Sequence, residues 1–275
     1  MRLSASTRVA GVIGHPVRHS LSPALHNAAF QALDLDWAYL AFDVAPGEGA
    51  DAVRAMRALG IEGLSVTMPH KEDAAGAVDR LSPAAERLGA VNCVHLRGTE
   101  LVGENVDGIG LLDALRLDEG FSPRGTRCLV LGAGGAARSV VLALVEAGAA
   151  DVAVWGRTPE RAEAAASSLG GRAVADPAEV DYDVLVNATP VGMPDSPGLP
   201  VDPAVLRAGT LVVDLIYHPP VTPLLEAARA AGCVAVNGLG MLIHQAAHQF
   251  RLWTGEDPPL EVMSAAAASA IAHRP

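Results

Sequence analysis

The chain has 275 residues, of which 50% are hydrophobic and 19% charged, so it is long and apolar enough to bury two modest cores and is not disordered. Its formal net charge of −11 argues against nonspecific binding to nucleic acid or to an acidic membrane, because either partner needs a basic face. The three cysteines are scattered, and we find no signal core and no apolar run of membrane-spanning length, so we expect a cytoplasmic protein with reduced thiols.

A glycine turn between a short strand and a helix stands in the middle of the chain. Gly132, Gly134 and Ala137 have the G-x-G-x-x-A spacing of a dinucleotide-binding βαβ unit. Gly132 permits the tight turn, Gly134 lets the backbone approach a pyrophosphate, and the small Ala137 allows the helix to pack closely on the strand. Apolar strands expected at 128–131 and 151–155 flank the turn and its helix. The alternative is an ordinary strand, turn and helix that bind nothing.

The residues before this unit are numerous enough to form a separate domain. Strands are expected at 9–13, 37–44, 63–66, 90–95 and 101–103, with a helix at 47–59. This alternation predicts a mostly parallel α/β sheet. The boundary should fall between about Asp107 and Gly125, where Ser-Pro-Arg-Gly resembles a linker. Beyond the glycine unit, strands are expected at 184–188, 211–215 and 232–236, followed by helices from Gly238 and from about Leu260.

Two serines stand two residues apart at the start of the first expected helix. Ser22 is a natural N-cap, with Pro23 at the first helical position. Together with Ser20 it would bring hydroxyl and backbone donors to one place, an arrangement that suits a small carboxylate. Taken alone, the segment favours the simpler interpretation that both serines only cap the helix.

Polar residues also follow the strand at 63–66. Thr67 and Lys71 are placed at its carboxyl end, where an open α/β sheet keeps its ligands, although a single lysine is usually a solvated surface residue. Asp107 opens a later helix and is expected to cap it, a role that is compatible with catalysis.

Arg157 follows the strand at 151–155, at the position where an NAD site usually has an acidic residue for the ribose 2′-hydroxyl. Arg157 and Arg161 can pair with the 2′-phosphate of NADP, whereas Glu160 argues the other way. We therefore predict NADP in preference to NAD. The alternative is that Arg157 is a solvated loop residue.

Met241, His244, Gln245 and His248 lie at helical spacing and share a face. The two histidines have the i, i+4 spacing of metal ligands. No third ligand or nearby acidic residue supports a metal, so we predict no metal site and a histidine pair on an aqueous face.

Seven motifs occur in the order typical of the shikimate dehydrogenase family, and the chain resembles that family over essentially its whole length. They are GHPVRHSLSPALHN at 14–27, VTMPHK at 66–71, AVN at 90–92, NVDG at 105–108, NATPVGM at 187–193, DLIYHP at 214–219 and GMLIHQ at 240–245. The resemblance implies two α/β domains. A substrate domain would comprise residues 1–106 and 240–275, with the C-terminal helices returning to it, and a Rossmann-type NADP-binding domain would comprise residues 107–239.

The resemblance also implies an activity, namely the reversible reduction of 3-dehydroshikimate to shikimate by NADPH in chorismate and aromatic amino acid biosynthesis. Lys71 and Asp107 would be the catalytic pair. Substrate contacts are implied for Ser20, Ser22, Thr67, Asn92, Tyr217 and Gln245, which for the serines reverses the local preference. Cofactor contacts are expected from Gly132, Ala133, Gly134, Gly135, Ala136, Arg157, Thr158, Arg161, Thr189, Leu215, Gly238 and Met241. Reaction in a cleft between the domains of a monomer or homodimer is expected.

Some positions depart from the family pattern. The family usually has Asn where Ser65 and Gly156 stand and Thr where Cys93 and Val106 stand. A quinate or aminoshikimate dehydrogenase built on the same frame therefore remains an alternative. An alternative from another class is a regulatory protein that binds NADP without turnover, which would explain the glycine turn but gives no reason for Lys71.

Overall fold

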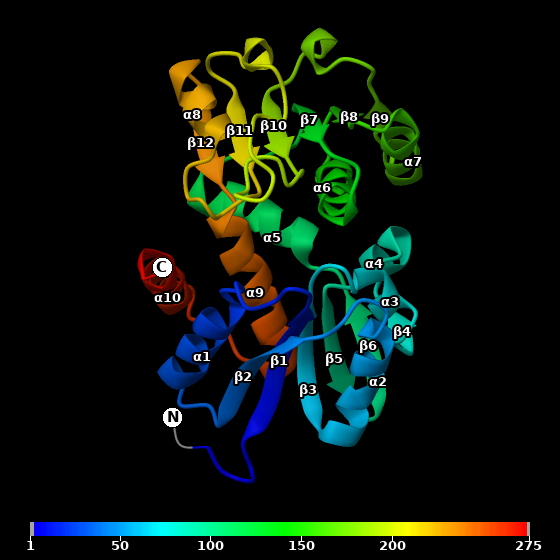
Figure 1. The fold of residues 1–275 in the computed structure, drawn as a ribbon, viewed down its shortest axis with the longest axis vertical. Helices are drawn as coiled ribbons and strands as arrows, with labels where there is room; N and C mark the ends of the chain where they lie inside the picture. The colour runs from blue at the N-terminus through cyan, green and yellow to red at the C-terminus, as the bar shows by residue number, and fades with distance from the viewer. Residues whose placement is uncertain (1–2, 274–275) are drawn as a thin grey trace. The chain divides into compact units, whose positions relative to one another are not determined.

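The computed structural model describes residues 3–273, and the chain forms two compact units (Figure 1). Unit 1 extends to Val106 and takes in the chain again from Ile243 onward, whereas unit 2 is Asp107–Leu242. In the described residues we find no helix that is long and apolar enough to cross a membrane.

Unit 1 is built on a six-stranded sheet in the order β2-β1-β3-β5-β6-β4. Its strands are β1 (Arg8–Gly14), β2 (Trp37–Asp43), β3 (Ile61–Val66), β4 (Arg80–Leu81), β5 (Cys93–Arg97) and β6 (Glu100–Glu104). β5 pairs antiparallel with β3 and β6, and the remaining pairs are parallel. The sheet is therefore mostly parallel, as predicted, and β5 is reversed because only Gly98 and Thr99 separate it from β6.

Helices from both ends of the chain belong to unit 1. They are α1 (Ser22–Ala32), α2 (Gly49–Leu59), α3 (Lys71–Ala75), α4 (Pro83–Leu88), most of α9 (Leu239–Thr254), and α10 (Leu260–Ala272). α10 packs against α1, and the Trp253 indole Nε1 of α9 donates to the Val94 carbonyl of β5 at 3.2 Å. The C-terminal helices thus return to the unit that contains the first strand.

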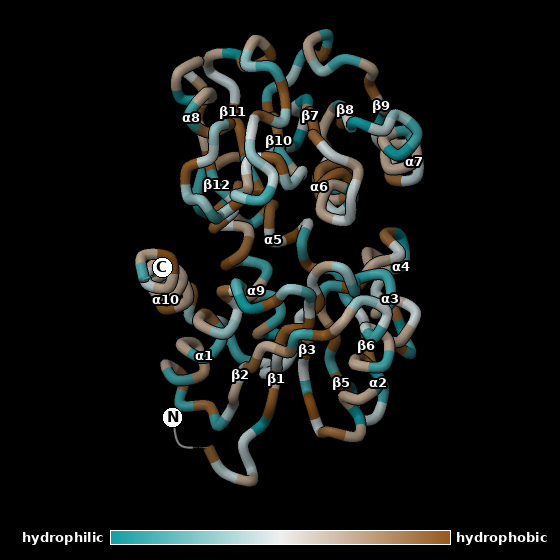
Figure 2. The backbone as a smooth tube through the Cα atoms, in the orientation of Figure 1, coloured by the Kyte–Doolittle hydropathy of each residue, from teal (hydrophilic) through white to brown (hydrophobic). Residues whose placement is uncertain are grey.

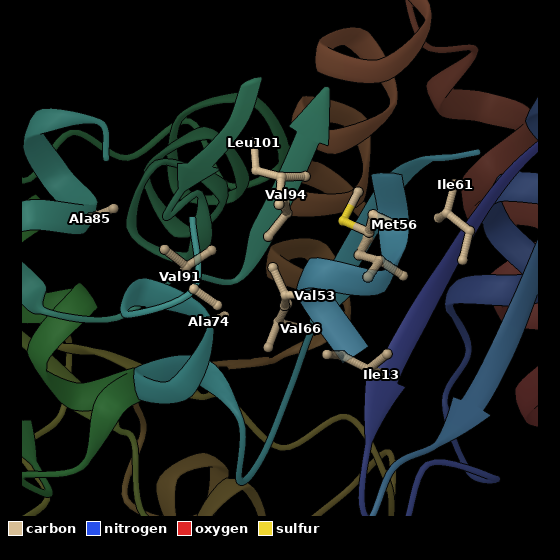
Figure 3. Close-up of a cluster of buried hydrophobic side chains, with 12 residues drawn as sticks. Ile13, Val53, Met56, Ile61, Val66, Ala74, Ala85, Val91, Val94 and Leu101 are labelled. Carbon is tan, nitrogen blue, oxygen red and sulfur yellow. The ribbon is translucent and has the colours of Figure 1, made fainter. Parts of the chain in front are cut away.

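A cluster of buried side chains joins α2 to the unit 1 sheet (Figure 3). Val53 and Met56 of α2 are fully buried in it, together with Ile13, Val66 and Val94 from three strands. Burial of each of the larger side chains contributes roughly 1.5–3 kcal/mol, so the cluster holds these strands in fixed register. Along the whole chain, short hydrophobic and hydrophilic runs alternate (Figure 2), as expected when one face of each element is buried.

Unit 2 contains a second six-stranded sheet, in the order β12-β11-β10-β7-β8-β9, and every pair in it is parallel. The strands are β7 (Arg127–Leu131), β8 (Asp151–Trp155), β9 (Arg172–Ala173), β10 (Val184–Asn187), β11 (Leu211–Asp214) and β12 (Val234–Asn237). Counted from β7, this is the 3-2-1-4-5-6 order of the Rossmann fold. The strand order reverses between β7 and β10, so their carboxyl ends are where such a sheet binds its ligand.

In unit 2 one helix and one short turn precede β7, and the remaining helices and turns connect the parallel strands, as parallel pairing requires. In chain order these helices and turns are α5 (Asp107–Asp113), the π-helical turn η1 (Ala114–Asp118), α6 (Gly135–Glu146), α7 (Pro159–Leu169), the short 3-10 turns η2 (Pro177–Glu179) and η3 (Pro203–Val205), and α8 (Pro223–Ala230). β7 is followed by α6 as the glycine motif predicted, and β8 occupies the predicted residues.

Two local predictions were wrong at helix α1 and strand β5. Ser22 is the first helical residue and Leu21 occupies the N-cap position, because burial of Leu21 draws it into a helical conformation. The Ser20 Oγ accepts a hydrogen bond from the Ser22 N–H at 3.2 Å, so Ser20 supplies the acceptor at this end. Asn92 lies just before β5 instead of inside a strand, although its backbone still bonds to Glu104 on one side and Val66 on the other.

Candidate active site

The loop between β1 and α1 carries the two serines. Ser22 is buried, with 6% of its surface exposed, and its side chain hydrogen-bonds to the phenol of Tyr39. Ser20 is partly exposed and lies next to it through the bond to the Ser22 N–H. Both hydroxyls therefore follow the carboxyl end of β1, the edge at which an open α/β sheet usually binds its ligands.

Thr67 and Lys71 follow the carboxyl end of the adjacent strand β3. The Thr67 N–H donates to the Ile13 carbonyl at 3.0 Å, so the loop after β3 stays attached to β1. A Cβ at Gly14 would collide with the Thr67 side chain, which shows how closely the two loops approach. Lys71 is partly buried and begins α3, and its carbonyl accepts from the Val91 N–H at 2.9 Å.

Asn92 and Gln245 are buried amides of unit 1, with 2% and 9% of their surfaces exposed. The Asn92 Oδ1 accepts from the Val106 N–H at 2.8 Å. The Gln245 Oε1 accepts from the Gln249 Nε2 at 2.9 Å, and Gln249 also donates to the Asn92 carbonyl at 3.2 Å. The two amides predicted to contact substrate are thus joined through one further side chain, Gln249.

In the turn between β7 and α6, one glycine is required by the backbone conformation, whereas two others leave space that a ligand could occupy. Gly132 has a φ of +118°, which glycine adopts readily, and a Cβ there would lie 3.1 Å from the Ala188 carbonyl oxygen. At Gly134 and Gly135, by contrast, an added Cβ would meet no protein atom within 4 Å. Gly134 also has an ordinary φ of −83°, so nothing in the protein itself requires glycine there. A pyrophosphate against the α6 N-terminus would require it.

A cavity of about 480 Å³ lies at the carboxyl ends of β7, β8 and β10. It is lined by predicted cofactor residues, namely Gly132, Ala133, Gly134, Arg157, Thr158, Arg161 and Thr189. Two arginines at the end of β8 give it positive charge beside the glycine turn. Its position is the switch point of the sheet, so the site fits NADP in both shape and charge.

The remaining predicted cofactor residues lie outside this lining. Gly135 and Ala136 are in the first turn of α6. Gly238 is buried against the backbone of Leu215, where a Cβ would collide, and Met241 lies in the first turns of α9. The sequence analysis did not predict other residues that line the cavity, among them Trp155, Pro190 and Leu199. The only signal for them was the Pro-rich loop that ends at Pro200.

A buried polar cluster under the loops after β10 and β11 was also missed. Asp214 accepts from the Thr222 Oγ1 at 2.6 Å, the Asn187 Nδ2 at 3.0 Å and the Ile216 N–H at 3.1 Å. Burial raises the pKa of the Asp214 carboxyl, although these hydrogen bonds oppose the shift. The cluster fixes the two loops to each other, and Tyr217 lies partly exposed in the second of them.

The described residues contain no group of histidine, cysteine and carboxylate side chains suited to a metal ion. The predicted aqueous face is wrong for His244, which is buried with 6% of its surface exposed, while His248 is partly buried. α9 packs this face inward because Gln245 and Gln249 lie on the same side of the helix.

Three family models match the chain. Residues 12–94 match the shikimate dehydrogenase substrate binding domain, residues 118–190 match shikimate / quinate 5-dehydrogenase, and residues 238–268 match the shikimate 5′-dehydrogenase C-terminal domain.

Individual relatives match it from end to end. A shikimate dehydrogenase (NADP+) of Citrifermentans bemidjiense is 47% identical over 284 residues, covering 98% of each chain. A shikimate dehydrogenase (NADP+) of Methanopyrus kandleri is 48% identical over 276 residues, covering 95% of each. The crystal structure of shikimate 5-dehydrogenase from Thermus thermophilus in complex with NADP(H) and shikimate matches with a TM-score of 0.90 and 41% identity, covering 96% of this chain and 99% of that one.

The chain belongs to the shikimate dehydrogenase family.

Membership of the shikimate dehydrogenase family confirms the resemblance, the two-domain α/β fold class and the assignment to NADP-dependent oxidoreductases. Most of the candidate side chains fall inside the segments that match family models. Asp107, Leu215 and Tyr217 fall between those segments, so their roles rest on the short motifs around them.

Proposed function

We propose that this protein catalyses the reversible, NADP-dependent interconversion of 3-dehydroshikimate and shikimate. One observation carries the proposal beyond family membership. Lys71 is the single lysine of the chain, and the other 19 of its 20 basic residues are arginines. The only lysine lies at the carboxyl end of β3, where the proposed reaction needs a group that donates a proton in one direction and accepts it in the other. Arginine cannot do this at neutral pH, whereas lysine can.

The substrate is a carboxylated, hydroxylated ring, and unit 1 offers groups that suit it. Ser20 and Ser22 place two hydroxyl groups for the carboxylate at the α1 N-terminus. Thr67, Asn92 and Gln245 supply side chains for ring hydroxyls, and Tyr217 is a further candidate contact through its phenol. The buried amides are held by hydrogen bonds before substrate arrives, which lowers the entropy lost on binding.

The chemistry assigns distinct roles to the catalytic residues. When bound, NADPH would supply the hydride for the ketone carbon, and negative charge would then develop on the ketone oxygen. The Lys71 ammonium stabilises that charge and gives its proton to the oxygen. The Asp107 carboxylate orients the substrate hydroxyls. In the direction of shikimate oxidation, Lys71 would accept the proton of the substrate hydroxyl.

NADP is the cofactor because the end of β8 carries Arg157, Thr158 and Arg161 in the cavity that the glycine turn borders. Guanidinium groups bind a phosphate with charge-assisted hydrogen bonds. Glu160 lies in the first turn of α7 and is not among the residues that line the cavity, so it is a weak rival for a ribose hydroxyl.

Quinate and aminoshikimate remain the alternative substrates, because Ser65, Cys93 and Val106 depart from the family pattern. All three side chains are buried, and Ser65 is hydrogen-bonded to Tyr39 and to Gln249. These contacts hold the Ser65 hydroxyl in the protein interior. Ser65 is therefore a poor candidate for a residue that selects quinate or aminoshikimate, and shikimate is favoured.

A spectrophotometric assay of NADP reduction tests the proposal. Purified protein with NADP should produce NADPH in the presence of shikimate, with a kcat/KM well above that for quinate and above that for shikimate with NAD. Absence of shikimate turnover would support the alternative of a regulatory NADP-binding protein. A higher kcat/KM with quinate would reassign the substrate.

We also propose a cytoplasmic location and a monomer or homodimer. All three cysteines are free thiols, which fits a reducing compartment.

A further inference from the structure

A chain of buried hydrogen bonds in unit 1 connects residues outside the proposed site with residues inside it. The Tyr39 Oη donates to the Ser65 Oγ at 2.6 Å, and the Ser65 Oγ donates to the Gln249 Oε1 at 2.5 Å. Gln249 is 1% exposed, and its Nε2 donates both to the Gln245 Oε1 and to the Asn92 carbonyl. Gln249 therefore uses both ends of its amide inside the protein.

The direction of this chain is fixed by its members. The Asn92 backbone carbonyl can only accept a hydrogen bond, so the Gln249 amide must turn its NH2 group toward it. The same NH2 group donates to the Gln245 side chain, so Gln245 must accept through its Oε1. At the other end, burial raises the pKa of the Tyr39 phenol, so Tyr39 keeps its proton and donates it to Ser65. Ser65 is then left to donate to Gln249.

We propose that Gln249 is a positioning residue that fixes the direction of the Gln245 amide, so that Gln245 offers its NH2 group and not its carbonyl to an oxygen of the ring substrate. The inference rests on the proposed function, in which Gln245 contacts shikimate. Asn92 is oriented in the same sense, because its Oδ1 accepts from the Val106 N–H. Both amides thus select ring oxygens that can accept a hydrogen bond.

Gln249→Met tests the role, because methionine has a similar length but no donor. Without the Gln249 NH2 group, the hydrogen bond that sets the direction of the Gln245 amide is lost. Loss of one directed hydrogen bond predicts a KM for shikimate raised about fivefold to tenfold, with the dissociation constant of NADP unchanged.

Ser65→Ala is the matched control. It removes a buried hydrogen bond from the acceptor end of Gln249 but leaves both donations of its NH2 group in place. It should lower the melting temperature about as much as Gln249→Met does while changing the KM for shikimate by less than about twofold. Equal changes in KM for the two variants would mean that Gln249 is only structural, and would overturn the inference.

A double variant tests whether Gln249 acts through Gln245. Gln245→Ala should raise the KM for shikimate, and adding Gln249→Met to it should raise the KM no further, because residues that act through one another are not additive. Multiplied effects would overturn the inference. A wild-type KM in Gln245→Ala would instead remove Gln245 from the substrate contacts, which is a failure of the proposed function.

A measurement on the wild-type enzyme tests the direction of the Gln245 amide and needs a variant only to assign the resonances. In 15N-labelled protein, the Gln245 side-chain NH2 resonances, assigned by their loss in Gln245→Ala, should shift on addition of shikimate. The Gln249 NH2 resonances should remain nearly unchanged. Gln245 NH2 resonances that do not respond to saturating shikimate would overturn the inference.

Discussion

His26 is a titratable residue buried among the aromatic rings of unit 1. Its ring stacks on Tyr39 with 4.4 Å between centroids and lies 5.0 Å from the ring of Trp253. It has no exposed surface, and neither of its nitrogens has a hydrogen-bond partner among the described residues. Burial lowers the pKa of this imidazole from 6.5 to about 3, so the folded protein holds it neutral.

Protonation of His26 should therefore oppose folding in acid. Between pH 6.5 and about 3 the unfolded chain binds a proton at this residue that the folded chain does not bind. The free energy of unfolding should fall as the pH falls through this window, by up to ~1.4 kcal/mol per pH unit from this group. His26→Phe keeps a ring in the stack and should flatten the slope.

Urea unfolding at several pH values within the window measures this effect. His273→Gln, at an exposed histidine after α10, is the control and should keep the wild-type slope. A His26→Phe slope equal to that of the wild type would contradict the prediction.

At the residue scale, the sequence indicates which side chains are candidates for the site, but it does not show how those side chains are hydrogen-bonded or buried. Motifs and strand ends predict roles for Lys71 and Asp107, yet nothing in the spacing of Gln245 and Gln249 shows which end of each amide meets the other. That direction depends on the Asn92 carbonyl, which is far away in the sequence. Burial of His244 was missed for a similar reason, since helical spacing alone does not say which face packs inward.

At the scale of elements, two glycines in the turn from β7 into α6 have different roles, one in ligand binding and one in folding. The Gly134 side-chain position is open and its φ is ordinary, whereas Gly132 has a positive φ and a carbonyl close by. Gly134→Val should therefore leave the melting temperature of the ligand-free protein nearly unchanged. It should weaken NADP binding by at least about tenfold, because the added methyl groups occupy the approach of the pyrophosphate.

Gly132→Ala provides the contrast, and it should lower the melting temperature without any ligand present. Isothermal titration with NADP and thermal unfolding of both variants give the two quantities. Wild-type NADP affinity in Gly134→Val would show that the turn does not carry the pyrophosphate.

Elements with strong local signals were predicted well, and those without were not. β8 was placed at its observed residues because an apolar run ends on both sides in polar or glycine residues. The two-residue strands β4 and β9 have no periodicity to detect, and they exist only because a neighbouring strand pairs with them. The start of α1 moved by one residue because core burial of Leu21 outweighed the capping preference of Ser22.

At the scale of the whole molecule, both units carry proposed site residues, and the catalytic pair is itself divided between them, because Asp107 is the first residue of unit 2. Lys71 and the serines belong to unit 1, whereas the glycine turn and its arginines belong to unit 2. The return of the chain to unit 1 after Leu242 has no local signal, because α9 continues as one helix through that point. It was predicted from the resemblance to the shikimate dehydrogenase family.

The most direct test of the proposed mechanism is kcat for shikimate oxidation in Lys71→Met, Asp107→Asn and the variant with both changes. Each single change should lower kcat by about a hundredfold to ten-thousandfold, as expected for loss of general acid–base catalysis. The double variant should be little worse than the worse single one, because the residues act as a unit.

Lys71→Arg is the matched control, since it keeps the charge of the single lysine but cannot release the proton, and it should also lose turnover. NADP affinity should survive in all four proteins, because the glycine turn and its arginines lie in unit 2 and are unchanged. A near-wild-type kcat for Lys71→Met would contradict the mechanism.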